Sequence, residues 1–242
     1  MKVFLAGTAK LKNHQAELAK CKYFLESFLT IQEWQIPYAI AAEMFLLDSG
    51  AFTFMKGKRA VNWEEYIEQY AEFINQHDIK HFFELDIDSV VGYEKVKQYR
   101  NTLESITNKQ SIPVWHINRG LKEWKSLCDA YSYVAIGGIA IKRFKPSNYK
   151  YLPGLINEAH KRGAIIHGLG FTNTTKYKTI IFDTVDSTTW IVGGKYGNVC
   201  RFQNGIMRQI YTPGMRCVKQ DELMLHNYAE WLKFQQYAEV HL

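Results

Sequence analysis

The stretch IPVWHINRGLKEWKSLCDAYSYVAIGG, residues 112–138, contains a strand, a helix and a second strand in immediate succession. IPVWHI at 112–117 and YVAIGG at 133–138 are short apolar runs that indicate buried strands. The segment near 120–130 has its apolar residues at helical spacing. Because parallel strands need a crossover connection, usually a helix, this order is typical of a parallel sheet.

The same alternation extends over most of the chain. Further strands are predicted at 3–7, at 44–48, at 81–87, at 164–170 and at 179–186, with an eighth at 198–203 or 206–211. Helices are predicted at 14–29, at 61–76, at 93–107, at 146–163 with Gly163 as the terminating glycine, and at 220–237. We therefore expect an α/β fold: a TIM (β/α)8-like barrel formed by residues 1–242 as one catalytic domain, with room for an irregular last βα unit. A doubly wound open sheet remains the alternative, because alternation alone does not distinguish the two.

Composition restricts the class of partner. Lys and Arg number 30 against 24 Asp and Glu, which gives a net charge of +6 and favours a polyanion such as nucleic acid. Aromatic residues reach 14%, which suits a core and also a surface that stacks on bases. The sequence has no apolar run long enough to cross a membrane and no signal peptide pattern, so we expect a cytoplasmic protein.

The cysteines are far apart, which predicts reduced thiols rather than a disulfide framework. Cys200, Cys217 and His226 do not match a zinc spacing, so neither a metal nor another cofactor is predicted. His116 and His167 could hold a divalent ion together with Asp86 if the barrel were a metallohydrolase.

Polar residues or glycines occur at the carboxyl ends of successive predicted strands. In chain order they are Asp48, Asp86, His116, Gly137 with Gly138, His167 and Asp186. Each alone has a structural explanation, such as a helix cap, an Asx turn or a core histidine. In a barrel, however, all these ends lie on one face, where catalytic groups come from several strands. The pattern therefore predicts an active site.

The loops after these strands add further candidates. In LDSGAF, 47–52, Ser49 can supply a hydroxyl and Gly50 permits a tight turn. The two glycines of IGGIA, 136–140, offer backbone N–H groups to a carbonyl or a phosphate, although the dinucleotide fingerprint is absent. Asp183 and Asp186 should point to opposite faces of their strand. Basic residues that could bind phosphates are Lys56, Lys58, Arg59, Lys142, Arg143 and Lys195, and aromatic residues that could sandwich a base are Phe52, Trp115 and Trp190.

LDSGAF, ELDID, IGGIA, HGLGFT and VDSTTW, in this order, resemble motifs of the tRNA-guanine transglycosylases and of their shorter phage and bacterial relatives linked to 7-deazaguanine in DNA. The resemblance covers about residues 44–190, roughly three-fifths of the chain. It implies a TIM barrel that exchanges a purine base in a nucleic acid through a covalent aspartyl–C1′ intermediate.

The resemblance also implies roles for individual residues. Asp186 matches the nucleophile, Asp48 the general acid/base, and Asp86 the aspartate that reads the base edge. The residues expected to contact the base are Asp86, Gly137, Gly138, Phe52, His116, His167 and Ser49. Some family features are missing: the zinc motif is not recognisable, and Lys195 stands in for the arginines that follow the nucleophile. Because the chain is also shorter than the tRNA-modifying members, DNA is favoured over tRNA as the substrate, with a modified or 7-deazapurine base as the second partner.

Three alternatives remain open from the sequence. A DNA glycosylase would use the same site but resolve the intermediate with water. A non-catalytic barrel would bind nucleic acid without reacting. A metal-dependent, amidohydrolase-like barrel would lose activity in excess chelator. The oligomeric state is not predicted.

Overall fold

Seven parallel strands form one curled sheet in the computed structural model, which describes residues 1–54, 61–191, 197–210 and 219–242. The strand order is β3-β2-β1-β7-β6-β5-β4. The strands are β1 (Lys2–Ala6), β2 (Tyr23–Ser27), β3 (Met44–Asp48), β4 (Val114–Trp115), β5 (Tyr133–Ile136), β6 (Ile165–Gly168) and β7 (Thr184–Ser187). The predicted parallel α/β arrangement is therefore confirmed.

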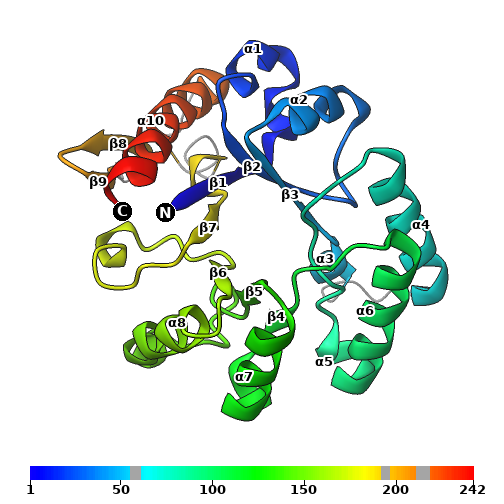
Figure 1. Ribbon diagram of the computed structural model, residues 1–242. Helices are drawn as coiled ribbons and strands as arrows, with labels where there is room; N and C mark the ends of the chain where they lie inside the picture. The colour runs from blue at the N-terminus through cyan, green and yellow to red at the C-terminus, as the bar shows by residue number, and fades with distance from the viewer. Residues whose placement is uncertain (55–60, 192–196, 211–218) are drawn as a thin grey trace.

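Helices lie around the outside of this sheet (Figure 1). The α-helices are α1 (Gln15–Leu18), α2 (Ile36–Ala41), α3 (Ala51–Phe54), α4 (Trp63–Gln76), α5 (Asp88–Val91), α6 (Tyr93–Thr107), α7 (Gly120–Ala130), α8 (Leu152–His160) and α10 (Gln220–His241). Short 3-10 turns are η1 (Thr8–His14), η2 (Glu33–Gln35), η3 (Ile117–Arg119), η4 (Pro146–Tyr151) and η5 (Thr174–Lys176). α4 shows why these helices form where they do: the Asn62 side chain caps its first turn, and one stripe that includes Tyr66, Tyr70 and Ile74 is buried.

The curl of the sheet is held by two separate layers of apolar side chains. Because both faces of a parallel strand are covered, its residues alternate between the layers. Phe4 of β1 belongs to an inner cluster with Leu46 of β3 and Val114 of β4, although β3 and β4 are the two ends of the sheet order. Val3 and Leu5 belong to the larger cluster that packs against the helices.

The segment 81–87 lies between the two ends of the sheet. It was predicted as a strand, but the structure shows only isolated parallel bridges, Leu47↔Phe82 and Phe83↔Ile112. Side chains replace part of the regular ladder here. The Tyr70 hydroxyl lies 3.1 Å from the carbonyl oxygens of both Leu47 and Phe83, and the Glu84 carboxylate accepts the N–H of Val114 at 2.8 Å.

The prediction of one helix over 14–29 was wrong. The chain forms only the four-residue α1 there and then enters β2, which lies between β1 and β3. Tyr23, Phe24, Leu25 and Glu26 are all buried. A short apolar run does not by itself distinguish a buried strand from a helix, and here the flanking residues added a false helical period. Asp48 consequently ends the third strand rather than the second.

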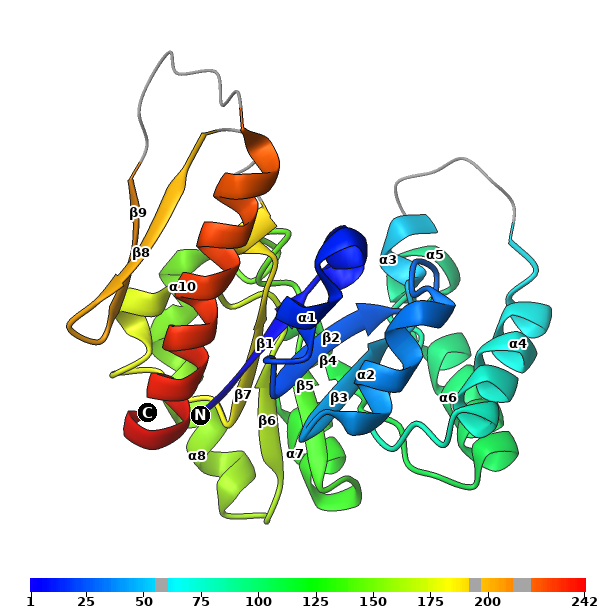
Figure 2. The same cartoon turned by 90° about the horizontal axis from the view of Figure 1, so that it is seen from above.

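The two candidates for an eighth strand form a separate hairpin. β8 (Val199–Gln203) and β9 (Ile206–Ile210) pair antiparallel and stand beside α10 (Figure 2). The side chains of Asn227 and Glu230 on α10 accept the N–H groups of Cys200 and Phe202. Neither candidate therefore extends the parallel sheet, because β8 is bonded to a helix on one side and to β9 on the other.

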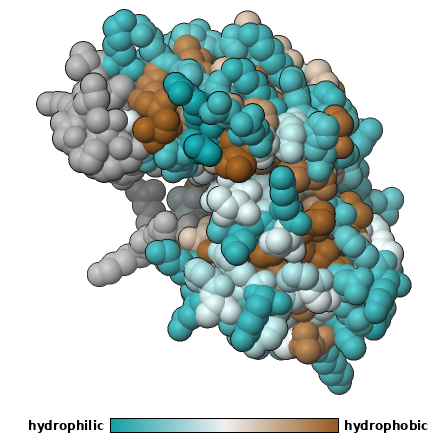
Figure 3. Space-filling model, turned by 90° about the vertical axis from the view of Figure 1, so that its left-hand side faces the viewer, coloured by the Kyte–Doolittle hydropathy of each residue, from teal (hydrophilic) through white to brown (hydrophobic). Residues whose placement is uncertain are grey.

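The face that carries α10 and the hairpin is mainly hydrophilic, with separate apolar patches (Figure 3). No helix within the described ranges is long and apolar enough to cross a membrane. Cys21, Cys128 and Cys200 are free thiols, and Cys217 lies outside the described residues.

Candidate active site

A cavity of about 370 Å³ opens at the carboxyl ends of the strands. Its size is at the lower end of the range of ligand pockets, ~300–1,000 Å³. Three predicted residues from different parts of the chain, Asp48, Asp86 and Asp186, line it together. Glu26 and Asp88 add two further carboxylates. The sequence-based expectation that the strand-end aspartates share one site therefore agrees with the geometry.

Asp48 ends β3 and begins a tight turn. Its Oδ2 accepts the N–H of Gly50 at 3.1 Å, and Gly50 has a φ of 74°. A Cβ on Gly50 would lie 2.7 Å from the Ser27 Oγ, so the turn needs glycine both for its backbone and for its space. The carboxylate reaches the cavity but is closely surrounded by protein. This burial, together with the nearby charges of Asp186 and Asp86, raises the pKa of Asp48 to about 6.

The carboxylate of Asp186 on β7 is held by two groups that both contact its Oδ1. Its Oδ1 accepts the N–H of Gly170 at 2.6 Å and lies 3.1 Å from the Nε2 of His167. Among the described residues, its Oδ2 has no hydrogen-bond partner. Asp183, three residues earlier, points to the other face, where it accepts the N–H of Ile166 at 2.7 Å. The expectation that only one of these two aspartates faces the cavity is confirmed.

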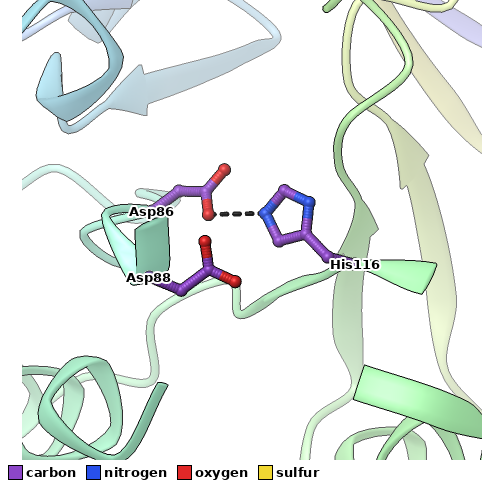
Figure 4. Close-up of side chains that lie close together, drawn as sticks. All are labelled: Asp86, Asp88 and His116. Carbon is purple, nitrogen blue, oxygen red and sulfur yellow. Dashed lines mark hydrogen bonds and ion pairs between the residues drawn. The ribbon is translucent and has the colours of Figure 1, made fainter. Parts of the chain in front are cut away.

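Asp86 and Asp88 both point toward the imidazole of His116 (Figure 4). The His116 Nε2 lies 2.6 Å from the Oδ1 of Asp86. Asp88 pairs instead with the guanidinium of Arg119, at 3.1 Å. Two neighbouring pairs, Asp86 with His116 and Asp88 with Arg119, therefore support this part of the cavity wall.

Arg119 lies beneath this wall and is almost fully buried. Its guanidinium lies 3.9 Å from the centroid of the Tyr93 ring and 3.6 Å from the carboxylate of Glu84. Arg100 pairs with the same carboxylate at 3.2 Å. Burial raises the pKa of Glu84 to about 7, although the two arginines act in the opposite direction. Glu84 does not line the cavity, so we assign it a structural role.

The donor atoms of Asp86, Asp88 and His116 lie within 4.8 Å of one another, a spacing that a divalent ion could bridge. Each carboxylate already has a partner, however. Asp86 pairs with the imidazole and Asp88 with the Arg119 guanidinium, which brings a permanent positive charge to the cluster. Because each carboxylate already has a partner and one partner is a cation, we assign no metal to these side chains.

The two glycines after β5 play different parts. The N–H of Gly137 donates to the carbonyl of Trp115 at 2.8 Å, so it is not available to a ligand. A Cβ on Gly137 would lie 2.6 Å from Val114 and 2.7 Å from His116, and this glycine therefore leaves room for the imidazole. Gly138, with a φ of 80°, is the member of the pair that lines the cavity.

Some of the other predicted site residues line the cavity, and others do not. Ser49 and Arg143 line it, and Lys142 is exposed next to Arg143. His167 is 0% exposed and lies behind Asp186, so the expectation that it contacts the base was wrong. Trp115 and Trp190 are buried in the core and do not line the cavity, which excludes them as base-stacking residues. The side chain of Phe52 and the whole of Lys56, Lys58, Arg59 and Lys195 lie outside the described residues.

Glu26 and Asp88 are cavity carboxylates that sequence reasoning missed, and Glu26 is the more deeply buried of the two. It lies on β2, and the backbone N–H and the hydroxyl of Thr8 both donate to its Oε1, the hydroxyl at 2.6 Å. Burial raises its pKa. The signal was present in YFLES, an apolar run that ends in an acid and a serine just as MFLLDS does, but the helix predicted over this region concealed it.

No protein-family model matches the sequence, and no curated protein matches it. Solved structures do match the fold. A protein from Coccidioides immitis, provisionally described as a fructose-1,6-biphosphate aldolase, aligns with a TM-score of 0.57 over 98% of this chain and 89% of that one, at 13% identity. Two structures of the carboxyl transferase domain of Rhizobium etli pyruvate carboxylase, with 3-hydroxypyruvate and with 3-bromopyruvate, align at 14% identity with TM-scores of 0.47 and 0.50.

The alignments with the two carboxyl transferase structures cover 98% of this chain but only 48% of each of those chains. At such identities a likeness concerns the fold and not the chemistry. The comparisons therefore assign the protein a TIM-barrel-like α/β fold.

Proposed function

We propose that this protein is a transglycosylase that exchanges a purine for a 7-deazapurine in nucleic acid, with DNA favoured over tRNA, through a covalent ester between Asp186 and the sugar C1′. The observation that carries the proposal is the group of carboxylates that β2, β3, β7 and the segment 86–88 place around one cavity. Cleavage of an N-glycosidic bond develops positive charge at C1′, and carboxylates fixed around that atom stabilise the charge.

Asp186 suits the role of nucleophile. The Gly170 N–H and the His167 ring fix one of its oxygens, and the other is left for the sugar. In the first step, Oδ2 forms the bond to C1′ while the bond from C1′ to the base nitrogen breaks with its electron pair on the base.

Asp48 suits the role of general acid/base. A carboxyl group with a pKa of about 6 can both give and take a proton near neutral pH. It would protonate the departing base and then accept a proton from the incoming base, which attacks C1′ and releases Asp186. The charges of Asp186 and Asp86 help to hold the proton on Asp48.

Asp86 suits recognition of the base. A guanine-like edge offers N1–H and N2–H donors, which a carboxylate accepts, and the imidazole of His116 at 2.6 Å fixes the orientation of Asp86. The base must leave the helical stack to reach this cavity. Arg143 is exposed at the cavity rim, where it can bind the phosphate of the extruded nucleotide.

The same proposal gives the segment 81–87 the eighth strand position of a barrel. It supplies Asp86, and its bridges to Leu47 and Ile112 join it to both ends of the sheet. Slow amide hydrogen exchange at Phe83 and Ile112 would support this arrangement, because both N–H groups donate across those bridges. Exchange at the rate of an exposed loop would argue against it.

The test incubates the protein with DNA and, separately, with tRNA, with and without a labelled 7-deazaguanine base. We expect released purine, incorporated label and a protein–nucleic acid adduct that Asp186→Asn abolishes. Asp183→Asn is the matched control: it lies just before the same strand but faces away from the cavity, so the adduct should persist.

Each alternative gives a different result in this test. Abasic sites without incorporation of any offered base would indicate a glycosylase and exclude exchange. Binding of nucleic acid with no chemistry, and no effect of Asp186→Asn, would indicate a non-catalytic barrel. Loss of activity in excess chelator would indicate a metal-dependent reaction at Asp86, Asp88 and His116.

A further inference from the structure

A chain of three hydrogen bonds runs through the buried interior of the sheet and ends on Asp186. The hydroxyl groups of Tyr133 and Thr184 are 2.6 Å apart. The Thr184 hydroxyl lies 2.8 Å from the Nδ1 of His167, and the Nε2 of the same ring lies 3.1 Å from the Oδ1 of Asp186. Tyr133, Thr184 and His167 are all buried, with His167 0% exposed.

One arrangement of protons satisfies every donor in this chain. If Tyr133 donates to Thr184, the threonine hydroxyl is free to donate to Nδ1, and the Nε2–H then donates to Asp186. If His167 carried a proton on Nδ1, the Thr184 hydroxyl would have to accept it. Among the described residues, the Thr184 hydroxyl hydrogen would then find no acceptor but Tyr133, whose own hydrogen would be left unpaired, and burying such a donor is unfavourable.

We propose that His167 is a positioning residue for the nucleophile: Tyr133 and Thr184 hold its ring as the neutral Nε2–H tautomer, and that ring fixes Oδ1 of Asp186 so that Oδ2 meets the substrate. This inference deepens the proposed function and rests on it for the identity of the reacting carbon. The ring cannot touch a ligand itself, because it has no accessible surface.

A neutral donor suits a carboxylate that must become an ester. The carboxylate gives up its negative charge when Oδ2 bonds to carbon, and an adjacent imidazolium would oppose that loss by favouring the charged form. A neutral N–H also orients Oδ1, but it stabilises the Asp186 carboxylate over the ester less than an imidazolium would. The Gly170 N–H, at 2.6 Å from the same oxygen, is likewise a neutral donor.

The first test is independent of any substrate. Nitrogen-15 shifts of the His167 ring at neutral pH should show a protonated Nε2 and an unprotonated Nδ1. In Tyr133→Phe the Thr184 hydroxyl hydrogen still has Nδ1 as its acceptor, so the same Nε2–H form should persist in this variant. A ring protonated at Nδ1 in the wild-type protein overturns the arrangement whatever the enzyme's substrate is.

The second test follows adduct formation. His167→Leu should slow it about 100-fold, the order of loss that misplacing a reacting group produces, with little change in KM because the ring does not touch the substrate. His167→Gln can place an amide N–H near the position of Nε2 and should recover most of the rate. Thermal unfolding of both variants reports folding separately from catalysis.

The outcomes separate the two claims. A wild-type rate of adduct formation in a folded His167→Leu variant would overturn the positioning role. So would a change in KM with no change in the rate. If the wild-type protein forms no adduct with any polymer, the proposed function fails, and the ring shifts then decide the His167 arrangement on their own.

Discussion

Replacing Asp48 by Asn should abolish base exchange and make the protein more stable at neutral pH. The folded state raises the pKa of this carboxyl group from 3.8 to about 6, chiefly through burial. Folding therefore disfavours the ionised form, and Asp48 costs the protein stability at every pH where it is ionised. Asn keeps the oxygen that accepts the Gly50 N–H but carries no charge.

The size of the effect follows from the two pKa values. A shift of about two units corresponds to about 3 kcal/mol, since one unit equals ~1.4 kcal/mol. Because the folded pKa is the higher one, wild-type stability is greatest, as far as Asp48 is concerned, below the unfolded pKa of 3.8, and it falls as the pH rises from there to about 6. The variant should gain about 3 kcal/mol at pH 7, roughly 6–12 °C in Tm, and less than ~1 kcal/mol at pH 4.

Urea unfolding of both proteins from pH 4 to pH 8 measures this gain. Glu84, whose pKa is about 7, titrates in the same window, but it is present in both proteins and largely cancels in the difference. Asp78→Asn is the control: Asp78 is exposed, its pKa is lowered by Lys109, and its replacement should bring no gain at pH 7. An equal gain at pH 4 and pH 7, or no gain at either, would refute the reasoning.

Three other changes test the packing around the cavity. Arg119→Met leaves Asp88 without its guanidinium and Glu84 with Arg100 alone, and it should cost about 3–5 kcal/mol in urea unfolding; a loss below 1 kcal/mol would show that the Arg119 pairs are not formed. Gly137→Ala forces a methyl group against His116 and should cost about 1–3 kcal/mol and displace the imidazole, which a crystal structure would show; an unmoved ring contradicts the packing. Asn227→Ala removes the acceptor for the Cys200 N–H, so hydrogen exchange should accelerate in β8 before it does in β1, and uniform acceleration would mean that α10 does not anchor the hairpin selectively.

The positions of most strands and helices could be predicted from the sequence. The apolar runs at 3–7 and 44–48 and the periodic helix at 61–76 all form as expected. The failures have specific causes. β2 is a short apolar run whose flanking residues imitate a helical period. The segment 81–87 is extended but has part of its ladder replaced by the side chains of Tyr70 and Glu84.

The candidate site was predictable only to the level of residue type and strand end. An acid after an apolar run is a local feature, and for Asp48, Asp86 and Asp186 that feature is enough to place them at one face of the sheet. Local sequence does not reveal which residues from other parts of the chain surround a carboxylate in the fold. Glu26 was missed because β2, which carries the same kind of signal in YFLES, was not recognised as a strand.

The sequence by itself determined a parallel α/β fold with acids at the ends of its strands, because strand formation, helical period and turn chemistry act over a few neighbouring residues. Only the tertiary structure decided which side chains share the cavity and which serve it from behind. His167 and Asp186 sit at equivalent strand ends in the sequence, yet one is sealed in the interior and the other opens to the cavity. That difference depends on the curl of the sheet and on bonds between neighbouring strands, since Gly170, Thr184 and Tyr133 come together around them only when β5, β6 and β7 pair.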